Sequence, residues 1–223
     1  MLIAGAGLAV ASPLLAAAAL AVKLEGGGPV LYRQTRVGRD GQRFVMYKLR
    51  TMAVDAETGT GPVWALRRDP RVTPLGRVLR RLHLDEFPQL FNVVKGEMAL
   101  VGPRPERPEF VERLAGELPG YLDRLAVRPG ITGLAQLNLP PDNTLDDVRR
   151  KLVLDLEYVA RGSLLLDLRI LLATFLRLFH IRTVVLLRLL GLRRSSRIDL
   201  RRAAPFELIP DDSSTPCALE LTT

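Results

Sequence analysis

The sequence predicts an α+β fold that is mainly helical, with a small β-hairpin, a membrane-embedded N-terminal helix and amphipathic helices at the membrane interface. Three observations carry this prediction. Residues 2–22 are uncharged and almost wholly apolar, residues 30–49 have the pattern of two strands around a turn, and residues 164–190 repeat apolar side chains at helical spacing. At 223 residues, the chain has room for one domain with appendages, or two small domains at most.

The charge balance favours anionic partners. The chain has 32 Lys and Arg against 24 Asp and Glu, a net charge of +8, which suits nucleic acid, an anionic membrane or phosphorylated substrates, and equally an ordinary solvated surface. Aromatic residues make up only 5% and do not alternate with basic runs, so we expect no nucleic-acid binding. The single Cys217 can form no internal disulfide, and with two histidines it offers no zinc-ligand spacing.

Three structures compete for the first apolar segment. A signal peptide fits least, because no positive residues precede the apolar core. A straight spanning helix needs about 20 apolar residues, which residues 2–22 barely supply. The third is a re-entrant helix, because Pro13 at mid-segment removes a helical hydrogen bond and kinks the chain.

In that re-entrant structure, the Ser12 hydroxyl is the expected local donor to the carbonyl that Pro13 frees. Each arm of about ten residues rises about 15 Å, half the hydrocarbon thickness of a bilayer. The chain can therefore dip into the membrane and return to the same face. The residues alone leave a re-entrant and a spanning helix equally acceptable.

The glycines at 26–28 and Pro29 end this helix. Residues 30–37 and 42–49 are then predicted to be strands around a turn at 38–41. One face of the second strand would carry Phe44, Met46 and Lys48, and the other Val45, Tyr47 and Leu49. Residues 51–73 are a polar loop with glycine and proline.

Two adjacent carboxylates, Asp85 and Glu86, stand in an otherwise apolar stretch. Pro88 suits the first turn of a helix that runs to about Val94, so the pair would lie just before a helix N-terminus. The helix dipole there favours carboxylates and bound phosphate alike. The pair is either ordinary helix-end charge, which is the commoner case, or a catalytic pair.

Two arginines are candidate phosphate-binding cations. Arg104 has a restricted backbone because prolines flank it on both sides, and Arg128 opens a second glycine-rich turn. Either could instead be an ordinary surface turn. A carboxylate pair with a fixed cation suits chemistry on a phosphate, with the anion as nucleophile or metal ligand.

Residues 152–158 and 164–190 are apolar and helical in pattern. In the longer segment the charged and polar half of the helical wheel carries Asp167, Arg169, Arg177, His180 and Arg188, and the apolar half carries Leu171, Leu172, Phe175, Leu178 and Phe179. We expect an interfacial amphipathic helix, because ionisable groups at bilayer depth are costly, with a buried core helix as the alternative. Residues 195–223 form a polar tail.

These segments, in this order, resemble the bacterial sugar transferase family, the monotopic polyprenyl-phosphate phosphoglycosyl transferases, over roughly residues 9–190. Each motif is weak alone, but their joint occurrence in order is specific. The matching motifs are Ala11-Ser12-Pro13, residues 28–34, Val37-Gly38, residues 46–52, Leu84-Asp85-Glu86, Phe91-Asn92-Val93, residues 95–98, residues 100–105, residues 128–136, Leu154-Asp155 with Tyr158, and Leu166-Asp167-Leu168.

The resemblance implies an enzyme that moves a phosphosugar from a UDP-sugar to polyprenyl (undecaprenyl) phosphate, with Mg²⁺, and releases UMP. That reaction initiates assembly of a glycan, such as an exopolysaccharide, an O-antigen or a glycoprotein. By resemblance, Asp85 is the nucleophile that forms a covalent phosphosugar-enzyme, and Glu86 is a metal ligand or base. Arg104 would clamp phosphate oxygens, with Lys48 and Arg128 as helpers.

The resemblance also makes Ser12-Pro13 the break of a re-entrant helix. It implies three parts: a membrane helix at 1–25, a catalytic domain with interfacial helices at 26–194, and the polar tail. The expected location is the cytoplasmic face of the bacterial inner membrane. The expected partners are a UDP-sugar, polyprenyl phosphate and membrane lipids; residues 26–28 and the apolar helices could support a homo-oligomer.

Two features depart from the family pattern. No basic stretch precedes the membrane helix in this sequence, and Asn138-Leu139-Pro140 stands where the family commonly has Asn-Gly-Arg. Arg149 or Arg150 could replace the lost arginine in recognition of the nucleotide or sugar. The departure keeps a second hypothesis open, a non-catalytic membrane-surface scaffold of the same fold.

Overall fold

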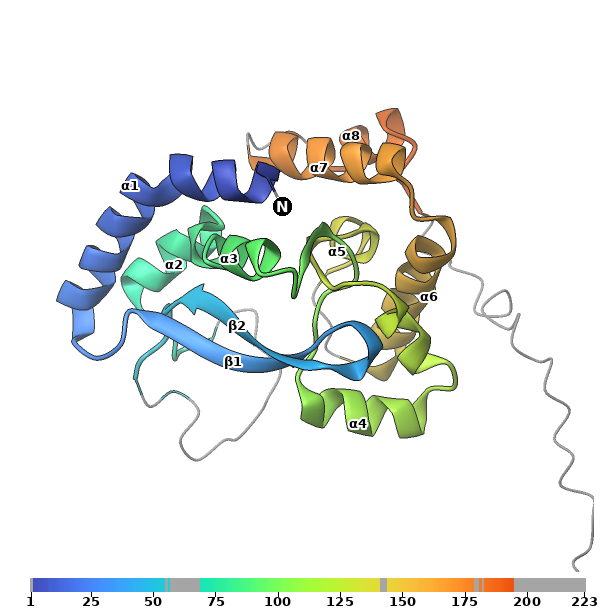
Figure 1. Ribbon diagram of the computed structural model, residues 1–223, viewed down its shortest axis with the longest axis horizontal. Helices are drawn as coiled ribbons and strands as arrows, with labels where there is room; N and C mark the ends of the chain where they lie inside the picture. Colours follow the sequence, from blue (N-terminus) through green and yellow to red (C-terminus); the bar gives the residue numbers. More distant parts are fainter. Residues whose placement is uncertain are drawn as a thin grey trace, which may run out of the picture.

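The computed structural model describes residues 2–54, 56, 69–140, 144–178, 181 and 183–194. In chain order, its elements are α1 (Leu2–Gly26), β1 (Leu31–Val37), η1 (Arg39–Gly41), β2 (Arg43–Leu49), α2 (Pro74–Arg81), η2 (Leu84–Glu86), α3 (Gln89–Val94), β3 (Ala99–Val101), α4 (Pro108–Glu117), η3 (Tyr121–Ala126), β4 (Gly130–Thr132), α5 (Leu134–Asn138), α6 (Leu145–Arg161), α7 (Leu164–Leu178) and α8 (Thr183–Leu189). The predicted α+β, mainly helical fold is confirmed (Figure 1). Most of the predicted loop at 51–73, and the predicted tail, lie outside the described residues.

The helix α1 contains Pro13 and changes direction midway along its length (Figure 1). Proline has no amide hydrogen, so the carbonyl of Ala9, four residues earlier, loses its helical donor. The Ser12 hydroxyl donates to that oxygen at 2.8 Å. The predicted replacement of the lost hydrogen bond is confirmed.

Both arms of α1 pack against the rest of the chain. In the first arm, Ala4 joins a core cluster with Met46 and Met98; in the second, Val22 packs with Leu49. The opposite side of the helix is exposed and apolar at Val10, Leu14, Leu20 and Leu24. Within the described part of the chain, one helix is long and apolar enough to cross a membrane, Ala4–Gly26, with a mean hydropathy of 1.9.

The predicted hairpin is confirmed. Strands β1 and β2 pair antiparallel from Leu31 opposite Leu49 to Val37 opposite Arg43. The turn includes Gly41 at φ 76°, a backbone conformation that favours glycine. On β2, Phe44 and Met46 are buried in the core, as expected for two residues on the same face of the strand.

A second, parallel pair of strands was not predicted from the sequence. Strands β3 and β4 pair through Ala99 with Gly130 and Val101 with Thr132. Their backbones approach so closely that a Cβ on Gly130 would lie 2.1 Å from the Gly102 nitrogen. Part of the glycine-rich turn at 128–133 therefore serves strand pairing.

The single amphipathic helix predicted over residues 164–190 is wrong in its continuity, because the segment forms α7 and α8. One straight helix would separate Ile170 from Leu187 by about 25 Å at 1.5 Å per residue. In the structure, both side chains belong to one core cluster, with Val101, Leu134 and Tyr158. The two helices still expose an apolar surface, since the exposed apolar side chains include Leu164, Leu165, Leu168, Leu172, Phe175, Val184, Val185 and Leu189.

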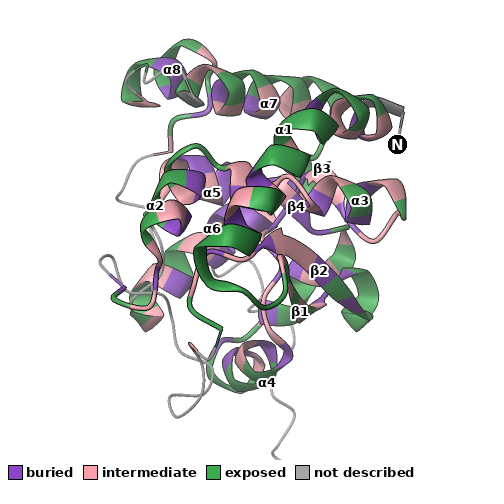
Figure 2. Ribbon diagram, turned by 90° about the vertical axis from the view of Figure 1, so that its left-hand side faces the viewer, coloured by how far each residue is buried: buried purple, intermediate pink, exposed green. Residues whose placement is uncertain are grey.

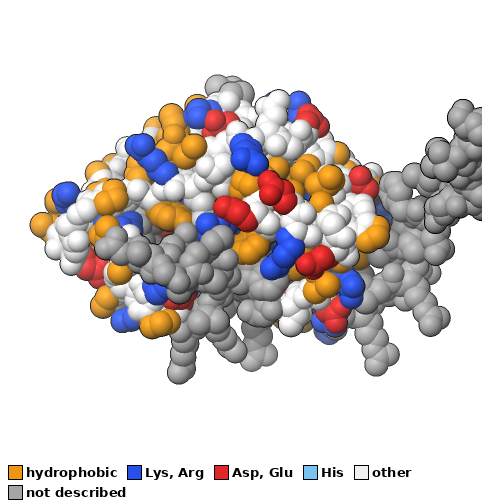
Figure 3. Space-filling model, turned by 90° about the horizontal axis from the view of Figure 1, so that it is seen from below, with side chains coloured by type: hydrophobic (Ala, Val, Ile, Leu, Met, Phe, Trp, Pro, Cys, Tyr) orange, Lys and Arg blue, Asp and Glu red, His pale blue; other side chains and the backbone are white. Residues whose placement is uncertain are grey.

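Burial follows this arrangement. Figure 2 shows exposed positions along the outer sides of α1, α7 and α8, and buried positions concentrated around β3, β4 and α5. On the face seen in Figure 3, the described basic and acidic side chains are interspersed and do not form a patch of one sign. Two residues of the predicted helical wheel, Phe179 and His180, lie outside the described residues.

Candidate active site

The carboxylate pair lies in a short 3₁₀ turn between two helices. Helix α2 ends before His83, whose φ of 55° is left-handed and reverses the chain direction. Asp85 and Glu86 then fall in η2, and Pro88 is the N-cap of α3, which runs to Val94 as predicted. The pair therefore lies three and four residues before Gln89, the first residue of α3.

A buried amide fixes α3 against β2. The Asn92 side chain is fully buried; its oxygen accepts from the Tyr47 amide at 3.2 Å, and its nitrogen donates to the Val45 carbonyl at 2.7 Å. The same nitrogen donates to a Glu97 oxygen at 2.7 Å. Because Lys48 follows Tyr47 on β2, this anchor sets where its side chain meets η2.

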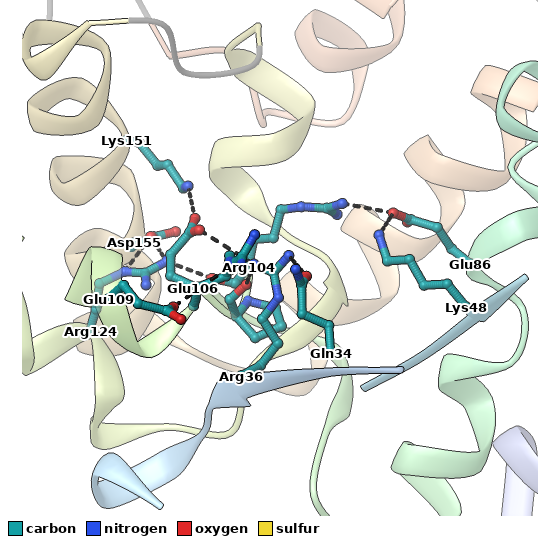
Figure 4. Close-up of polar contacts among 12 residues, drawn as sticks. Gln34, Arg36, Lys48, Glu86, Arg104, Glu106, Glu109, Arg124, Lys151 and Asp155 are labelled. Atoms are coloured by element: carbon teal, nitrogen blue, oxygen red, sulfur yellow. Dashed lines mark hydrogen bonds and ion pairs between the residues drawn. The ribbon is translucent and has the colours of Figure 1, made fainter. Parts of the chain in front are cut away.

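Two cations converge on one oxygen of Glu86. Lys48 Nζ lies 2.8 Å and an Arg104 Nη2 nitrogen 2.7 Å from Glu86 Oε1 (Figure 4). Burial acts to raise the pKa of the Glu86 carboxyl, but Arg104 and Lys48 together outweigh it and hold that pKa well below its usual range. Glu86 in turn raises the pKa of Arg104. Burial lowers the pKa of Lys48, and Glu86 partly offsets that effect.

Asp85 has a different environment from its neighbour. Asp85 is only 8% exposed, and no hydrogen bond or ion pair joins its carboxylate to another residue in the described part of the chain. Burial, and then repulsion from Glu86, raise the pKa of Asp85. A buried carboxylate that no other described residue binds, with cations nearby, has the character expected of a nucleophile or a metal ligand.

The segment that carries Arg104 is anchored along its backbone. Four consecutive carbonyls at 103–106 each accept one hydrogen bond. The donors are Gly130 N to Pro103 O (2.9 Å), Arg124 Nη2 to Arg104 O (2.8 Å), Arg36 Nη1 to Pro105 O (2.9 Å) and Val37 N to Glu106 O (2.9 Å). We call residues 103–106 the arginine strap.

A network of ion pairs lies behind the arginine strap, on the side away from Glu86 (Figure 4). Arg124 donates to Asp155 Oδ2 from Nε at 3.0 Å and from Nη2 at 2.7 Å. Glu106 pairs with Lys151 and lies 3.6 Å from Arg36. These cations balance the negative charge of Glu106. Burial raises the pKa of its carboxyl, but Lys151 and the neighbouring arginines lower that pKa to about 2.

The sequence analysis did not identify this network as part of a site. One signal was present: Asp155 is seven residues after Val148 and three after Leu152, which puts a carboxylate on the buried side of α6. A carboxylate at such a position needs a buried cation. Its partner Arg124 lies in η3, 31 residues earlier, and no local pattern could identify it.

The other predicted cation, Arg128, lies apart from this cluster. It is exposed and lines a pocket of about 240 Å³ with Arg39, Arg43 and Glu97, beside the turn of the hairpin. Lys48 is five residues along β2 from Arg43, about 17 Å at strand spacing. The structure therefore brings together Lys48, Glu86 and Arg104, with Asp85 adjacent, and it leaves Arg128 at a separate pocket.

Asn138, two residues before the position of the arginine in the family pattern, has a structural role here. Asn138 donates to the Leu134 carbonyl at 2.9 Å and to the Leu192 carbonyl at 3.1 Å, and its oxygen accepts from the Arg194 amide at 2.9 Å. It thus ties the end of α5 to the chain beyond α8. Arg149, a suggested replacement, is exposed on α6 and pairs with Asp146 at 3.0 Å.

An apolar groove of about 660 Å³ runs between α1 and the hairpin. Leu8, Leu15, Ala16 and Ala19 supply its α1 wall, and Pro88 lines it at the start of α3. Pro88 is only three residues from Asp85. The groove therefore extends from the exposed apolar helix to the segment that carries the carboxylate pair.

The carboxylate pair fits a shared Mg²⁺ site better than a closed protein cage. Within the described residues, no group of three or more His, Cys, Asp or Glu side chains is arranged to hold a metal. Mg²⁺ usually keeps several waters and takes one or two carboxylates together with substrate phosphates. No other described residue binds the Asp85 carboxylate, and Lys48 and Arg104 both bind Oε1 of Glu86, so both carboxylates retain oxygens for an ion.

Comparisons with a family model and with individual relatives point to the same family. The family model described as bacterial sugar transferase matches residues 1–181. A Bacillus subtilis (strain 168) protein, provisionally named undecaprenyl-phosphate N-acetylgalactosaminyl 1-phosphate transferase, is 52% identical over 119 residues, which cover 53% of this chain and 66% of that protein. The UDP-N-acetylgalactosamine-undecaprenyl-phosphate N-acetylgalactosaminephosphotransferase of Aeromonas hydrophila is 45% identical over 163 residues, 73% of this chain and 38% of its own length.

A third relative is named for a different sugar. The UDP-glucose:undecaprenyl-phosphate glucose-1-phosphate transferase of Caulobacter vibrioides (strain ATCC 19089 / CIP 103742 / CB 15) is 45% identical over 165 residues, 73% of this chain and 61% of that protein. The chain thus spans between about two fifths and two thirds of these relatives. All three relatives have undecaprenyl phosphate in their names; two are named for N-acetylgalactosamine and one for glucose.

Proposed function

Because this chain belongs to the bacterial sugar transferase family, we propose that it transfers a phosphosugar from a UDP-sugar to undecaprenyl phosphate at a membrane surface. The observation that carries the proposal is the buried Asp85 beside Glu86, Lys48 and Arg104; no other described residue forms a hydrogen bond or ion pair with its carboxylate. Relatives that are over 40% identical act, by name, on undecaprenyl phosphate and a UDP-sugar.

In the proposed first step, an oxygen of Asp85 attacks the sugar-linked phosphorus of the UDP-sugar. The bond between that phosphorus and the bridging oxygen breaks, and UMP leaves with the electron pair. The product is a covalent aspartyl-phosphosugar. This route divides a transfer between two anionic substrates into two displacements.

In the second step, a phosphate oxygen of undecaprenyl phosphate attacks the same phosphorus, and the bond to Asp85 breaks. The carboxylate is regenerated, and the sugar leaves on a lipid diphosphate. Arg104 offers a planar pair of donors to the phosphate oxygens in both steps. Glu86 holds Arg104 and Lys48 in place and keeps both cations charged in a partly buried site.

Mg²⁺ held by Asp85 and Glu86 would supply charge neutralisation for the diphosphate. Lys48 and Arg104 also place two positive charges beside the carboxylate pair, each within 3 Å of Glu86 Oε1. Because the pKa of Asp85 is raised, its ionised form is a stronger base than an exposed aspartate and hence a better nucleophile.

The membrane supplies the second substrate. Both arms of α1 pack on the same domain, which supports a re-entrant helix. We place this helix, as part of the proposal, on the cytoplasmic face of the bacterial inner membrane. The apolar groove beside Pro88 would then lie where a lipid chain approaches the site. The product would initiate assembly of a surface glycan, such as an exopolysaccharide.

One assay tests the proposal. Purified protein is incubated with Mg²⁺, undecaprenyl phosphate and a panel of UDP-sugars that includes UDP-glucose and UDP-N-acetylgalactosamine, and UMP release is measured. We expect release that depends on both substrates and is abolished by Asp85→Asn. Absence of UMP with every UDP-sugar in protein that is folded by circular dichroism would refute the proposal and favour a non-catalytic scaffold.

A further inference from the structure

Arg104 is held on two sides by different groups. Its guanidinium donates forward to Glu86 at 2.7 Å, and its carbonyl accepts from Arg124 Nη2 at 2.8 Å (Figure 4). A proline on each side restricts the backbone, so rotation at Arg104 is limited to few torsions. The Arg124 contact therefore fixes the starting point of a long side chain.

Arg124 is itself buried and held by several contacts. Its side chain is 2% exposed, and its partner Asp155 is 3% exposed. The guanidinium makes two hydrogen bonds to one oxygen of Asp155, at 3.0 Å and 2.7 Å, and lies 5.4 Å from the centre of the Tyr121 ring. A single planar group thus connects α6, η3 and the arginine strap.

We propose that Arg124, held by Asp155, is a positioning residue that sets the reach of Arg104 toward the phosphate bound at Asp85. This inference rests on the proposed phosphosugar transfer. Arg124 does not touch the reacting atoms; it acts through the Arg104 main chain. A shift of about 1 Å in a phosphate-binding group can cost about 100-fold in rate, so a contact of this kind has a measurable effect.

The chain offers two variants that remove the contact in different ways. Arg124→Met with Asp155→Leu replaces a buried ion pair by apolar side chains, an exchange that proteins often tolerate. Arg124→Lys keeps a charge for Asp155 but replaces the planar fork by a single ammonium. Arg194→Met with Glu157→Leu is the matched control, because this pair, at 2.6 Å, also joins an arginine to α6 but lies outside the arginine strap.

The measurement is kcat/KM for the UDP-sugar in UMP release, with circular dichroism and thermal unfolding as checks of folding. We expect both Arg124 variants to lose about 10-fold or more in kcat/KM and the control to stay within twofold. The key comparison combines each Arg124 variant with Arg104→Lys and compares its loss in kcat/KM with the loss of Arg104→Lys alone. If Arg124 acts through Arg104, the combined variant loses no more than Arg104→Lys alone, whereas a purely structural role makes the losses multiply.

Each outcome decides the inference. Non-additive losses support it. A folded Arg124 variant within twofold of wild type, or losses that multiply with Arg104→Lys, would overturn it while leaving the proposed function intact. If the apolar double variant fails to fold, Arg124→Lys decides by the same criteria. If wild-type protein releases no UMP, the inference fails together with the proposed function.

Discussion

The ion cluster at Glu86 makes a quantitative prediction for Glu86→Gln. This change keeps the shape of the side chain and removes the charge that Lys48 and Arg104 share. At 2.7 and 2.8 Å, each pair is worth about 6 kcal/mol of gross attraction at an effective dielectric constant of about 20. Desolvation offsets most of this, and removing one partner of a buried pair costs about 3–5 kcal/mol.

The expected net loss for Glu86→Gln is smaller than that range. The amide oxygen still accepts a hydrogen bond, and the Arg104 side chain is 36% exposed, so solvent screens part of its charge. We expect a loss of about 2–3 kcal/mol in the free energy of unfolding, which lowers Tm by about 4–12 °C for a chain of this size. Adding Lys48→Met removes one of the two unpaired cations and should restore roughly half of the loss.

The assay is thermal unfolding of purified, lipid-reconstituted protein, followed by circular dichroism. Glu117→Gln is the control, because its pair with Arg113 spans 3.7 Å with both side chains over 40% exposed, and it should change stability by at most about 0.5 kcal/mol. The pKa of Glu86 is lowered, so its stabilisation is fully present above the ordinary glutamate pKa of 4.5 and is lost as the pH falls toward the folded-state value.

The difference in Tm between wild type and Glu86→Gln should therefore be largest near neutral pH and narrow below about pH 4.5. A Glu86→Gln loss no larger than that of Glu117→Gln would refute the electrostatic reasoning. A loss that stays constant down to pH 3 would also contradict it, because Glu86 would then bind protons equally in the folded and unfolded states and its pKa would not be lowered by folding.

Three further predictions follow from single features of the structure. Because the pKa of Asp85 is raised above 3.8, the acid limb of the UMP-release profile should lie above that pH, and Glu86→Gln, which removes the repulsion, should move it to lower pH. Gly76→Ala should destabilise the fold by about 1–3 kcal/mol in chemical unfolding, because its Cβ would lie 2.1 Å from the Thr51 carbonyl oxygen. Gly116→Ala, whose Cβ would meet nothing within 4 Å, is the control and should be neutral or stabilising by about 0.5 kcal/mol. Cysteines placed at both ends of α1 should react with a membrane-impermeant reagent from the same face; labelling from opposite faces would rule out a re-entrant helix.

The parts of the fold that the sequence predicts depend on near neighbours. The turn at 38–41 set the hairpin, and Pro88 marked the start of α3 to within one residue. The Ser12 contact was also predictable, because donor and acceptor are three residues apart. Glycine, proline and hydroxyl side chains act on the backbone next to them.

The parts that were missed depend on distant residues. The pairing of β3 with β4 joins Ala99 to Gly130, and both strands are too short to show a pattern. The break between α7 and α8 serves a core that Ile170 and Leu187 share, which helical periodicity alone does not reveal.

In the candidate site, too, local motifs were predictable from the sequence and long-range contacts were not. The motif around Asp85 and Glu86, and the prolines around Arg104, are local, so these residues could be named from the sequence. That Lys48 and Arg104 bind the same carboxylate oxygen depends on Asn92 and the arginine strap. The location of Arg128 at the hairpin turn depends on the β3–β4 pairing, which no sequence pattern indicated.

The central claim is covalent capture of a phosphosugar by Asp85, and intact-protein mass spectrometry tests it most directly. Wild-type protein is incubated with Mg²⁺ and the UDP-sugar that supports UMP release, without lipid acceptor. The account predicts a mass increase of one phosphosugar, which disappears when undecaprenyl phosphate is added and never forms in Asp85→Asn. UMP release at the full rate by Asp85→Asn, or an adduct of the same mass in that variant, would contradict it.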